Sequence, residues 1–242
     1  MAVARVYIVR HGETEENRRG IIQGHLDTQL NADGIEQARR VAEALRAVPF
    51  DSAISSDLSR AAKVSTYGTF AYLWDGKRTH NEFKIEKTAQ AILRYHPDTQ
   101  LRKKMEIRER FLGALQGLPY AARKNVTGKS TIEPMENMNK RALAWWDDAI
   151  VQYAISLPDA RASNVLVVSH GGFIVHLVQG LMANERITVA EGVAVGKCLN
   201  TAVAIVEVGK DGKGVLVQYG NIAHLATKQG GMDLVQGNAD EQ

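Results

Sequence analysis

Two histidines stand directly after apolar runs of the sequence, at positions where they could act on one ligand. His11 follows residues 3–9 in "VYIVRHGET", and His170 follows residues 165–168 in "VLVVSHGG". Short runs rich in β-branched residues are typical of strands buried on both faces. In open parallel sheets, ligands bind beyond the carboxyl ends of the strands. We therefore expect both histidines to line one crevice.

Arg60 is a third candidate for this crevice. The stretch "FDSAISSDLSRA" predicts a short strand over residues 53–55, followed by a helix capped by Ser56 or Asp57. Arg60 would then lie in the first helical turn, where a positive charge opposes the helix dipole. Two interpretations stay open from this segment alone: an anion bound opposite Arg60, or an arginine exposed to solvent.

Helical patterns separate these strands and a further apolar run over residues 202–208. Residues 31–48 predict an amphipathic helix with Asn31 as its N-cap, and residues 82–97 predict another. Residues 135–155 predict a long helix, whose inward stripe would be Met138, Ala142, Trp145, Ala149 and Tyr153. The alternation of strands and helices predicts an α/β fold, a three-layer α/β/α sandwich with a mostly parallel central sheet.

The composition narrows the class of protein. Hydrophobic residues make up 45% of the 242 residues, as in ordinary globular proteins, and the net charge is only +3 with lysines and arginines dispersed among acids. This disfavours nucleic acid as a partner and suits a small anionic substrate. Cys198 is the only cysteine, so we expect a buried thiol and no disulfide. The first apolar run is too short for a signal or a membrane span, which favours a cytoplasmic protein without a membrane partner.

The motifs, taken in chain order, resemble those of the histidine phosphatase superfamily, which has the phosphoglycerate mutase-like fold. The matching stretches are "RHGET" with Asn17, "IIQGHLDTQLNADGIEQA", "SSDLSRA", "RERFLGALQG", "VVSHGG" and "LNTAVAIVEV". A single Arg-His-Gly would be weak support, whereas matches in the expected order over nearly the whole chain are specific.

The resemblance implies catalytic roles for five residues. His11 would be the nucleophile that takes the phosphoryl group onto a ring nitrogen, and it must be neutral to attack. Arg10, Arg60 and His170 would hold the phosphoryl oxygens. Glu109, in "RERFLGALQG", would protonate the leaving oxygen and later activate water.

Other positions match secondary roles in the family. Glu13 is an alternative acid by its position, although in the family it more often supports the pocket. The expected contacts to the phosphate or to the rest of the substrate are Asn17, Gln23, Gly24 and Gly171, with a further backbone donor at Gly172. The remaining histidines show no clustered spacing, so we expect no metal site and no cofactor: His25, His80, His96, His176 and His224.

Three functions remain open from the sequence. The leading one is a metal-independent phosphatase that hydrolyses a small phosphomonoester, of the sugar or glycerate phosphate class, through a phosphohistidine. The others are a cofactor-dependent phosphoglycerate mutase and a weakly catalytic binding or scaffold member of the family. Gln23 resembles the phosphatase branch. The paired arginines of the mutases are missing, although Arg123 and Lys124 could partly substitute for them.

We expect one domain over residues 1–228, with residues 74–135 forming an insertion or lid over the site, and a flexible tail over residues 229–242. Substrate identity would depend on the insertion. Ile132 stands where the family usually has glycine, which puts the geometry of that loop in doubt. The sequence leaves the oligomeric state open.

Overall fold

The apolar runs become strands of one central sheet in the computed structural model, which describes residues 2–62, 87–125, 129–158 and 162–226. In this part of the chain the sheet has seven strands in the order β3-β2-β4-β1-β6-β7-β5. Only β6, which is antiparallel to both of its neighbours, departs from the common direction among these strands. The strands are β1 (Ala2–Arg10), β2 (Phe50–Ser56), β3 (Leu101–Lys104), β4 (Ser163–Ser169), β5 (Ile187–Val189), β6 (Val203–Gly209) and β7 (Gly214–Asn221).

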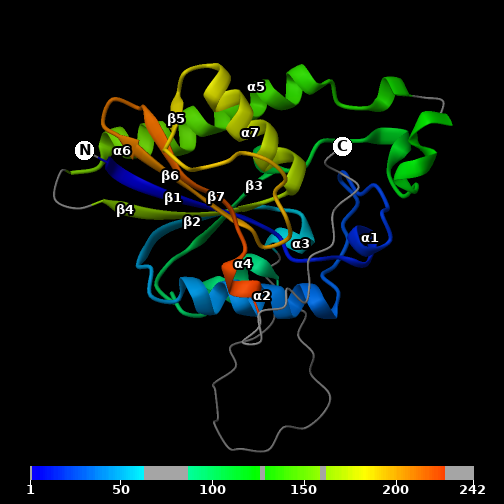
Figure 1. The fold of residues 1–242 in the computed structure, drawn as a ribbon, viewed down its shortest axis with the longest axis horizontal. Helices are drawn as coiled ribbons and strands as arrows, with labels where there is room; N and C mark the ends of the chain where they lie inside the picture. Colours follow the sequence, from blue (N-terminus) through cyan, green and yellow to red (C-terminus); the bar gives the residue numbers. More distant parts are fainter. Residues whose placement is uncertain (1, 63–86, 126–128, 159–161, 227–242) are drawn as a thin grey trace, which may run out of the picture.

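Helices cover both faces of this sheet (Figure 1). One face packs against α2 (Ala32–Leu45) and α4 (Thr88–Leu93), and the other against α5 (Met135–Trp146) and α7 (Gly171–Ala183). Three shorter helices are α1 (Glu15–Arg18), α3 (Ser59–Ala62) and α6 (Gln152–Ser156). The predicted three-layer α/β/α fold with a mostly parallel sheet is therefore confirmed.

Each face of the sheet has its own apolar core, because successive residues of a strand point to opposite sides. In β1, Val6 and Ile8 belong to the core beneath α5 and α7. Tyr7 and Val9, which alternate with them, belong to the core beside α2 and α4. A strand that is covered on both faces must be apolar at nearly every position, and this explains the run that the sequence shows.

The pairing of β1 with β4 brings the two histidines together. These strands are parallel neighbours, and Arg10 lies opposite Ser169 in their register. The next residue of each strand end is a histidine, so His11 and His170 leave the sheet at the same level. The expected meeting of the two histidines follows from this register, and their ring centroids are 5.2 Å apart.

The inward stripe predicted for residues 135–155 is displaced by one position in its second half. After α5 the chain makes a π-helical turn, Asp147–Val151, before it continues as α6. A π-turn holds one more residue than an α-turn and so rotates the following face by about one position. Beyond α5 the fully buried residues are accordingly Ile150 and Ala154, whereas Ala149 and Tyr153 are half-buried against the same core.

Several other element boundaries differ from expectation. The helix predicted over residues 82–97 is helical at Thr88–Leu93, and residues 82–86 lie outside the described part. The strands β3, β5 and β7 were not predicted: β3 is a charged edge strand and β5 has three residues. The turn before β7 contains Asp211-Gly212, with φ +74° at Gly212, which is a readable hairpin signal.

Two predicted regions lie partly or wholly beyond the described residues. Residues 74–86 of the expected insertion and the expected tail over 229–242 are among those not described. The described part of the insertion includes β3 and short 3₁₀ segments, among them Tyr120–Asn125. No helix within the described residues has the length and apolar character that a membrane crossing requires.

Trp146 offers a direct test of the core beneath α5, since its side chain is 1% exposed. We expect Trp146→Ala to lower the free energy of unfolding by about 3–5 kcal/mol, because it removes buried apolar surface and leaves a cavity. Urea denaturation followed by far-UV circular dichroism measures this loss. The control is Ile155→Ala on α6, where the side chain is 45% exposed and the expected change is within about 0.5 kcal/mol. Equal losses in the two variants would contradict the packing.

Candidate active site

A cluster of buried basic side chains lies beyond the carboxyl ends of β1, β2 and β4. Arg10 ends β1 and His11 follows it, Arg60 lies on α3 after β2, and His170 follows β4. None of these four residues is more than 2% exposed. Isolated cations are costly to bury, so a group of them in one place indicates a site that takes an anion. The interpretation of Arg60 as a solvent-exposed residue is wrong.

The hydrogen bonds of His11 define which ring nitrogen can attack. Its Nδ1 lies 2.7 Å from the carbonyl oxygen of Gly12. A carbonyl only accepts, so the ring hydrogen is on Nδ1 and the lone pair is on Nε2. Arg60 Nε donates to this Nε2 at 3.2 Å. Burial, and then the charges of Arg60 and Arg10, hold the pKa of His11 well below its ordinary value, so the ring is neutral.

The guanidinium of Arg60 is fixed by the backbone of the preceding loop. Its Nη1 donates to the carbonyl of Leu26 at 2.7 Å, and its Nη2 donates to that of Gly24 at 2.8 Å. Gly24 has φ +51°, and a Cβ there would lie 2.4 Å from Gln116 Oε1. Glycine is therefore required where this loop bends toward Arg60.

The predicted caps of the helix that carries Arg60 are wrong. Asp27 accepts hydrogen bonds from the backbone nitrogen of Ser59 at 2.6 Å and from its hydroxyl at 2.7 Å. A carboxylate from another loop thus satisfies the first turn of α3. Asp57 instead accepts from Arg108 Nε at 2.7 Å, and Ser56 contacts His170.

The loop before β6 holds Arg10 and the backbone of His11. Arg10 Nη1 donates to the carbonyl of Cys198 at 2.6 Å, and the predicted burial of Cys198 is confirmed. Asn200 Nδ2 donates to the carbonyl of His11 at 3.0 Å. Thr201 has φ +55°, a conformation that β-branched residues rarely adopt. This strained turn is formed by the "LNTAV" stretch, whose contact with His11 is not evident from the sequence.

His170 faces His11 across the crevice. The two ring centroids are 5.2 Å apart at an interplanar angle of 61°. Nε2 of His170 lies 2.8 Å from Ser56 Oγ, a contact not expected from the sequence. Burial, followed by the charge of Arg60, lowers the pKa of His170 well below its ordinary value. Gly171, the next residue, begins α7.

Glu109 completes the cluster from the side of α7. Its Oε2 accepts from the backbone nitrogen of Gly172 at 2.9 Å, and its Oε1 accepts from that of Arg110 at 2.8 Å. A Cβ on Gly172 would lie 2.6 Å from Oε1, so the carboxyl packs directly on this glycine. The side chain is buried, and burial raises the pKa of Glu109 above its ordinary value. Such a carboxyl keeps its proton to a higher pH than an exposed glutamate does.

Two side chains hold the backbone of Glu109, and a third holds one of these two. Arg141 Nη2 donates to its carbonyl at 3.0 Å, and His25 Nε2 donates to the same oxygen at 2.8 Å. Arg141 Nε also donates to Glu133 at 2.7 Å. Glu133 directly follows Ile132, so the loop that the unusual isoleucine put in doubt still supports Glu109 through Arg141.

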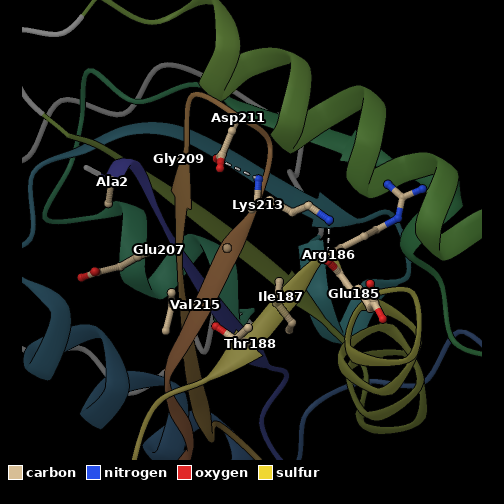
Figure 2. A pocket seen from close by; sticks show the side chains of 11 residues that line it. Ala2, Glu185, Arg186, Ile187, Thr188, Glu207, Gly209, Asp211, Lys213 and Val215 are labelled. Carbon is tan, nitrogen blue, oxygen red and sulfur yellow. Dashed lines mark hydrogen bonds between the residues drawn. The ribbon is translucent and has the colours of Figure 1, made fainter.

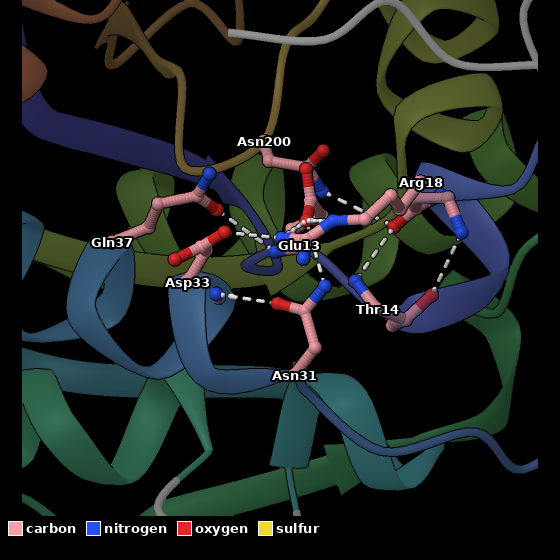
Figure 3. A network of polar contacts seen from close by, with 9 residues as sticks. Glu13, Thr14, Arg18, Asn31, Asp33, Gln37 and Asn200 are labelled. Carbon is pink, nitrogen blue, oxygen red and sulfur yellow. Dashed lines mark hydrogen bonds and ion pairs between the residues drawn. The ribbon is translucent and has the colours of Figure 1, made fainter. Parts of the chain in front are cut away.

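Glu13 belongs to a separate network that fixes the histidine loop (Figure 3). Its Oε1 accepts from Arg18 Nε at 2.9 Å and from Asn31 Nδ2 at 2.7 Å, and its backbone nitrogen donates to Gln37 at 2.8 Å. A Cβ on Gly34 would lie 2.0 Å from the carbonyl oxygen of Glu13, so the helix approaches the loop very closely. This carboxylate supports the wall of the site and is not directed at His11.

The predicted substrate contacts lie in the loops around the cluster. Asn17 forms a reciprocal cap with Thr14 on α1, with hydrogen bonds of 3.1 and 3.2 Å. Asn200 Nδ2 also lies 3.4 Å from Asn17 Oδ1. Gln23 is fully buried, and its Oε1 accepts from Thr28 at 2.5 Å. These bonds fix Asn17 and Gln23 in the segments that follow His11 and precede Arg60.

A cavity of about 510 Å³ lies away from this cluster, at the β5 and β7 edge of the sheet (Figure 2). It includes Ala2 at the start of β1, whereas Arg10 at the other end of the same strand belongs to the histidine cluster. A strand of this length separates the two places by about 26 Å. In the described part of the chain, no three His, Cys, Asp or Glu side chains are grouped so that they could hold a metal ion.

The chain is similar to a family of known proteins. Residues 6–67 and 85–221 match the model of the family described as the histidine phosphatase superfamily, branch 1. The chain is 28% identical to a broad-specificity phosphatase of Saccharomyces cerevisiae, over 92% of this chain and 88% of the relative. It is 26% identical to a metal-independent phosphoserine phosphatase of Arabidopsis thaliana, over 93% and 84% of the two chains.

Solved structures show the same fold. A phosphoglycerate mutase from Bacillus anthracis superposes with a TM-score of 0.66 at 22% identity, covering 91% of this chain and 94% of that one. A mycobacterial glucosyl-3-phosphoglycerate phosphatase superposes with a TM-score of 0.65 at 22% identity, covering 88% and 97%. Because the family model spans most of the sequence, the chain belongs to branch 1 of the histidine phosphatase superfamily.

Proposed function

We propose that this enzyme hydrolyses small phosphomonoesters through a phosphohistidine formed at His11. The observation that carries the proposal is the neutral His11 ring, whose Nε2 lone pair is directed at Arg60 inside a buried cluster of cations. The curated relatives include a broad-specificity phosphatase and a metal-independent phosphoserine phosphatase. We therefore keep the expectation that the reaction needs neither a metal nor a cofactor.

In the first step, His11 Nε2 attacks the phosphorus while the bond from phosphorus to the ester oxygen breaks. Arg60 Nε, which bonds to Nε2 in the free protein, turns to a phosphoryl oxygen, and Arg10 and His170 contact the others. Glu109 gives its proton to the leaving oxygen, so the alcohol departs neutral. The raised pKa of Glu109, caused by burial, keeps this proton available.

In the second step, water attacks the phosphorus of phosphohistidine. Glu109, now a carboxylate, takes a proton from the water as the bond from phosphorus to Nε2 breaks. Inorganic phosphate leaves, and both His11 and Glu109 return to their starting protonation states. Two easier displacements thus replace one difficult hydrolysis.

The substrate class in this proposal is a small phosphorylated metabolite, of the sugar or glycerate phosphate type. Asn17, Gln23, Gly24 and Gly171 are its proposed contacts, and the insertion over residues 74–135 of the single domain 1–228 is the proposed cover of the site. Related phosphatases are named for phosphoserine and for glucosyl-3-phosphoglycerate, which are compounds of this size. A cytoplasmic location and the absence of nucleic acid and membrane partners stay predictions.

The mutase alternative needs cations at the mouth of the site. Arg123, one of the two candidates, has its guanidinium over the ring of Tyr120, 4.4 Å from the centroid. Tyr120 N in turn donates to the carbonyl of Gly20 at 2.9 Å. Stacking uses the face of the guanidinium and leaves its N–H groups, which lie in the plane, able to donate to a phosphate, so this contact does not separate the two functions. Release of phosphate without interconversion of the two phosphoglycerates would support the phosphatase. Interconversion of 3- and 2-phosphoglycerate in the presence of the bisphosphate would instead support the mutase.

Removal of the proposed nucleophile tests the central claim. We expect His11→Ala to abolish phosphate release from para-nitrophenyl phosphate and from a panel of sugar and glycerate phosphates, assayed with EDTA. The wild type, quenched during turnover, should carry a phosphoryl label that is labile in acid and stable in alkali. The control is His96→Asn, since His96 packs against Phe50 away from the cluster. Full activity of His11→Ala would overturn the proposal.

Substitution of Glu109 tests its role as the acid. We expect Glu109→Gln to reduce kcat/KM about 100-fold or more for esters with poor leaving groups, and much less for para-nitrophenyl phosphate. A good leaving group departs without a proton, whereas an alkoxide does not. The measurement is a plot of kcat/KM against the pKa of the leaving group. An equal loss across the series would rule out proton donation by Glu109.

The expected pH profile of activity follows from the shifted pKa values of His11 and Glu109. His11 must be neutral to attack, and burial lowers its pKa. Protonation of His11 should therefore abolish activity only when the pH falls well below the ordinary pKa of histidine. Glu109 must be protonated for the first step, and burial raises its pKa, so activity should persist above the usual carboxyl range and then fall as pH rises. We expect a bell-shaped profile of kcat/KM for alkyl phosphates with its maximum on the acidic side of neutral. A maximum on the alkaline side would contradict this assignment.

A further inference from the structure

His170 is buried with only one of its ring nitrogens bonded. Nε2 lies 2.8 Å from Ser56 Oγ. Nδ1 is also buried, but it has no hydrogen-bond partner among the residues that the structure describes. Buried polar atoms are nearly always paired, so an exception in an active site calls for an explanation.

The direction of the bond to Ser56 follows from what the hydrogen of that hydroxyl can reach. The backbone nitrogen of Leu58, which can only donate, lies 3.4 Å from Ser56 Oγ. The oxygen accepts from Leu58 and keeps a second lone pair, so this contact by itself leaves the direction open. Among the described residues, His170 Nε2 is the only acceptor that bonds to this hydroxyl, and a buried hydroxyl hydrogen needs an acceptor, so Ser56 donates to Nε2. Since a neutral imidazole carries one hydrogen, a ring that accepts at Nε2 has that hydrogen on Nδ1.

We propose that Ser56 is a positioning residue, whose hydroxyl holds His170 in the neutral form with its hydrogen on Nδ1. The Nδ1–H is then a donor for the phosphoryl group on or near His11, whose ring centroid is 5.2 Å away. The tautomer is a property of the free protein. Its use in phosphoryl transfer rests on the proposed phosphatase function.

The physical reason lies in the charge of the ligand. The opposite tautomer would direct a lone pair from Nδ1 at a phosphoryl oxygen, which is repulsive. A protonated ring would donate as well, but its positive charge beside Arg10 and Arg60 would be costly to bury before the substrate arrives. A neutral donor avoids both problems. Burial keeps the pKa of His170 low enough for this form to persist.

The sequence supplies a matched control in Ser55. Ser55 and Ser56 are the last two residues of β2, and both are fully buried. The hydroxyl of Ser55, however, donates to the carbonyl of Ser56 at 2.9 Å. Ser55→Ala and Ser56→Ala thus each remove one buried hydroxyl from the same strand end. Only the second removes the bond to His170. Ser56→Thr keeps the hydroxyl.

The first experiment locates the hydrogen without any need for turnover. Protein labelled with ¹⁵N at histidine is examined by long-range ¹H–¹⁵N correlation, with the His170 signals assigned by their loss in His170→Asn. We expect wild type, Ser55→Ala and Ser56→Thr to show the hydrogen on Nδ1, and Ser56→Ala to lose this preference. A hydrogen on Nε2 in the wild type overturns the proposal. This test uses the wild-type protein alone, so it remains decisive even if Ser56→Ala does not fold.

The second experiment measures the consequence for catalysis. We expect Ser56→Ala to lower kcat/KM for para-nitrophenyl phosphate by about 10- to 100-fold, and Ser55→Ala and Ser56→Thr by less than about threefold. Equal effects of Ser56→Ala and Ser55→Ala would show a merely structural role and overturn the positioning claim.

Failure of the proposed function would leave a distinct signature. If the wild type releases no phosphate from any ester, the affinity for inorganic phosphate, measured by calorimetry, replaces the kinetic comparison. Weaker binding by Ser56→Ala than by Ser55→Ala then supports the donor role of His170 without hydrolysis. Equal affinities overturn that role, whatever the enzyme's activity.

Discussion

The burial of two guanidinium groups beside two imidazoles is the constraint that organises this protein. Charges removed from water need compensation, and here much of it comes from carbonyl oxygens of the backbone. Arg60 donates to the carbonyls of Leu26 and Gly24, and Arg10 donates to that of Cys198. Carbonyls fix the position of a cation without cancelling its charge. The cluster therefore keeps a strong attraction for a dianion, while the same field suppresses protonation of His11.

The rest of the fold supplies those carbonyls at fixed positions. Parallel β1 and β4 place His11 and His170 level with each other, and the loop between α1 and α2 and the loop before β6 supply the carbonyls. The turn before β6 carries a local conformational cost, since Thr201 is held in the left-handed region. His224 bonds to the Thr201 hydroxyl at 3.0 Å, and Asn200 holds the carbonyl of His11. The strain thus lies where the nucleophile's backbone is fixed.

Most of the layers and the meeting of the two histidines could be predicted from local patterns, whereas the places of Arg60 and Glu109 depended on the resemblance to the family. Apolar runs that end in His-Gly identify β1 and β4, and the N-cap Asn31 was read correctly. What failed depended on distant contacts. The π-turn after α5 shifts the buried face, and the cap of α3 comes from Asp27, 32 residues before Ser59. No local pattern specifies either.

The surroundings of Glu109 in the structure differ from those that its neighbours in the chain suggest. Arg108 and Arg110 flank Glu109 in the chain, so its sequence context suggests an ion-paired carboxylate. In the structure Arg108 pairs with Asp57, and Arg110 Nε donates to the carbonyl of Glu133. With its sequence neighbours bonded elsewhere, Glu109 is left buried on two backbone amides. A carboxyl that must gain and lose a proton needs this kind of environment, because a directly paired cation would hold it ionised.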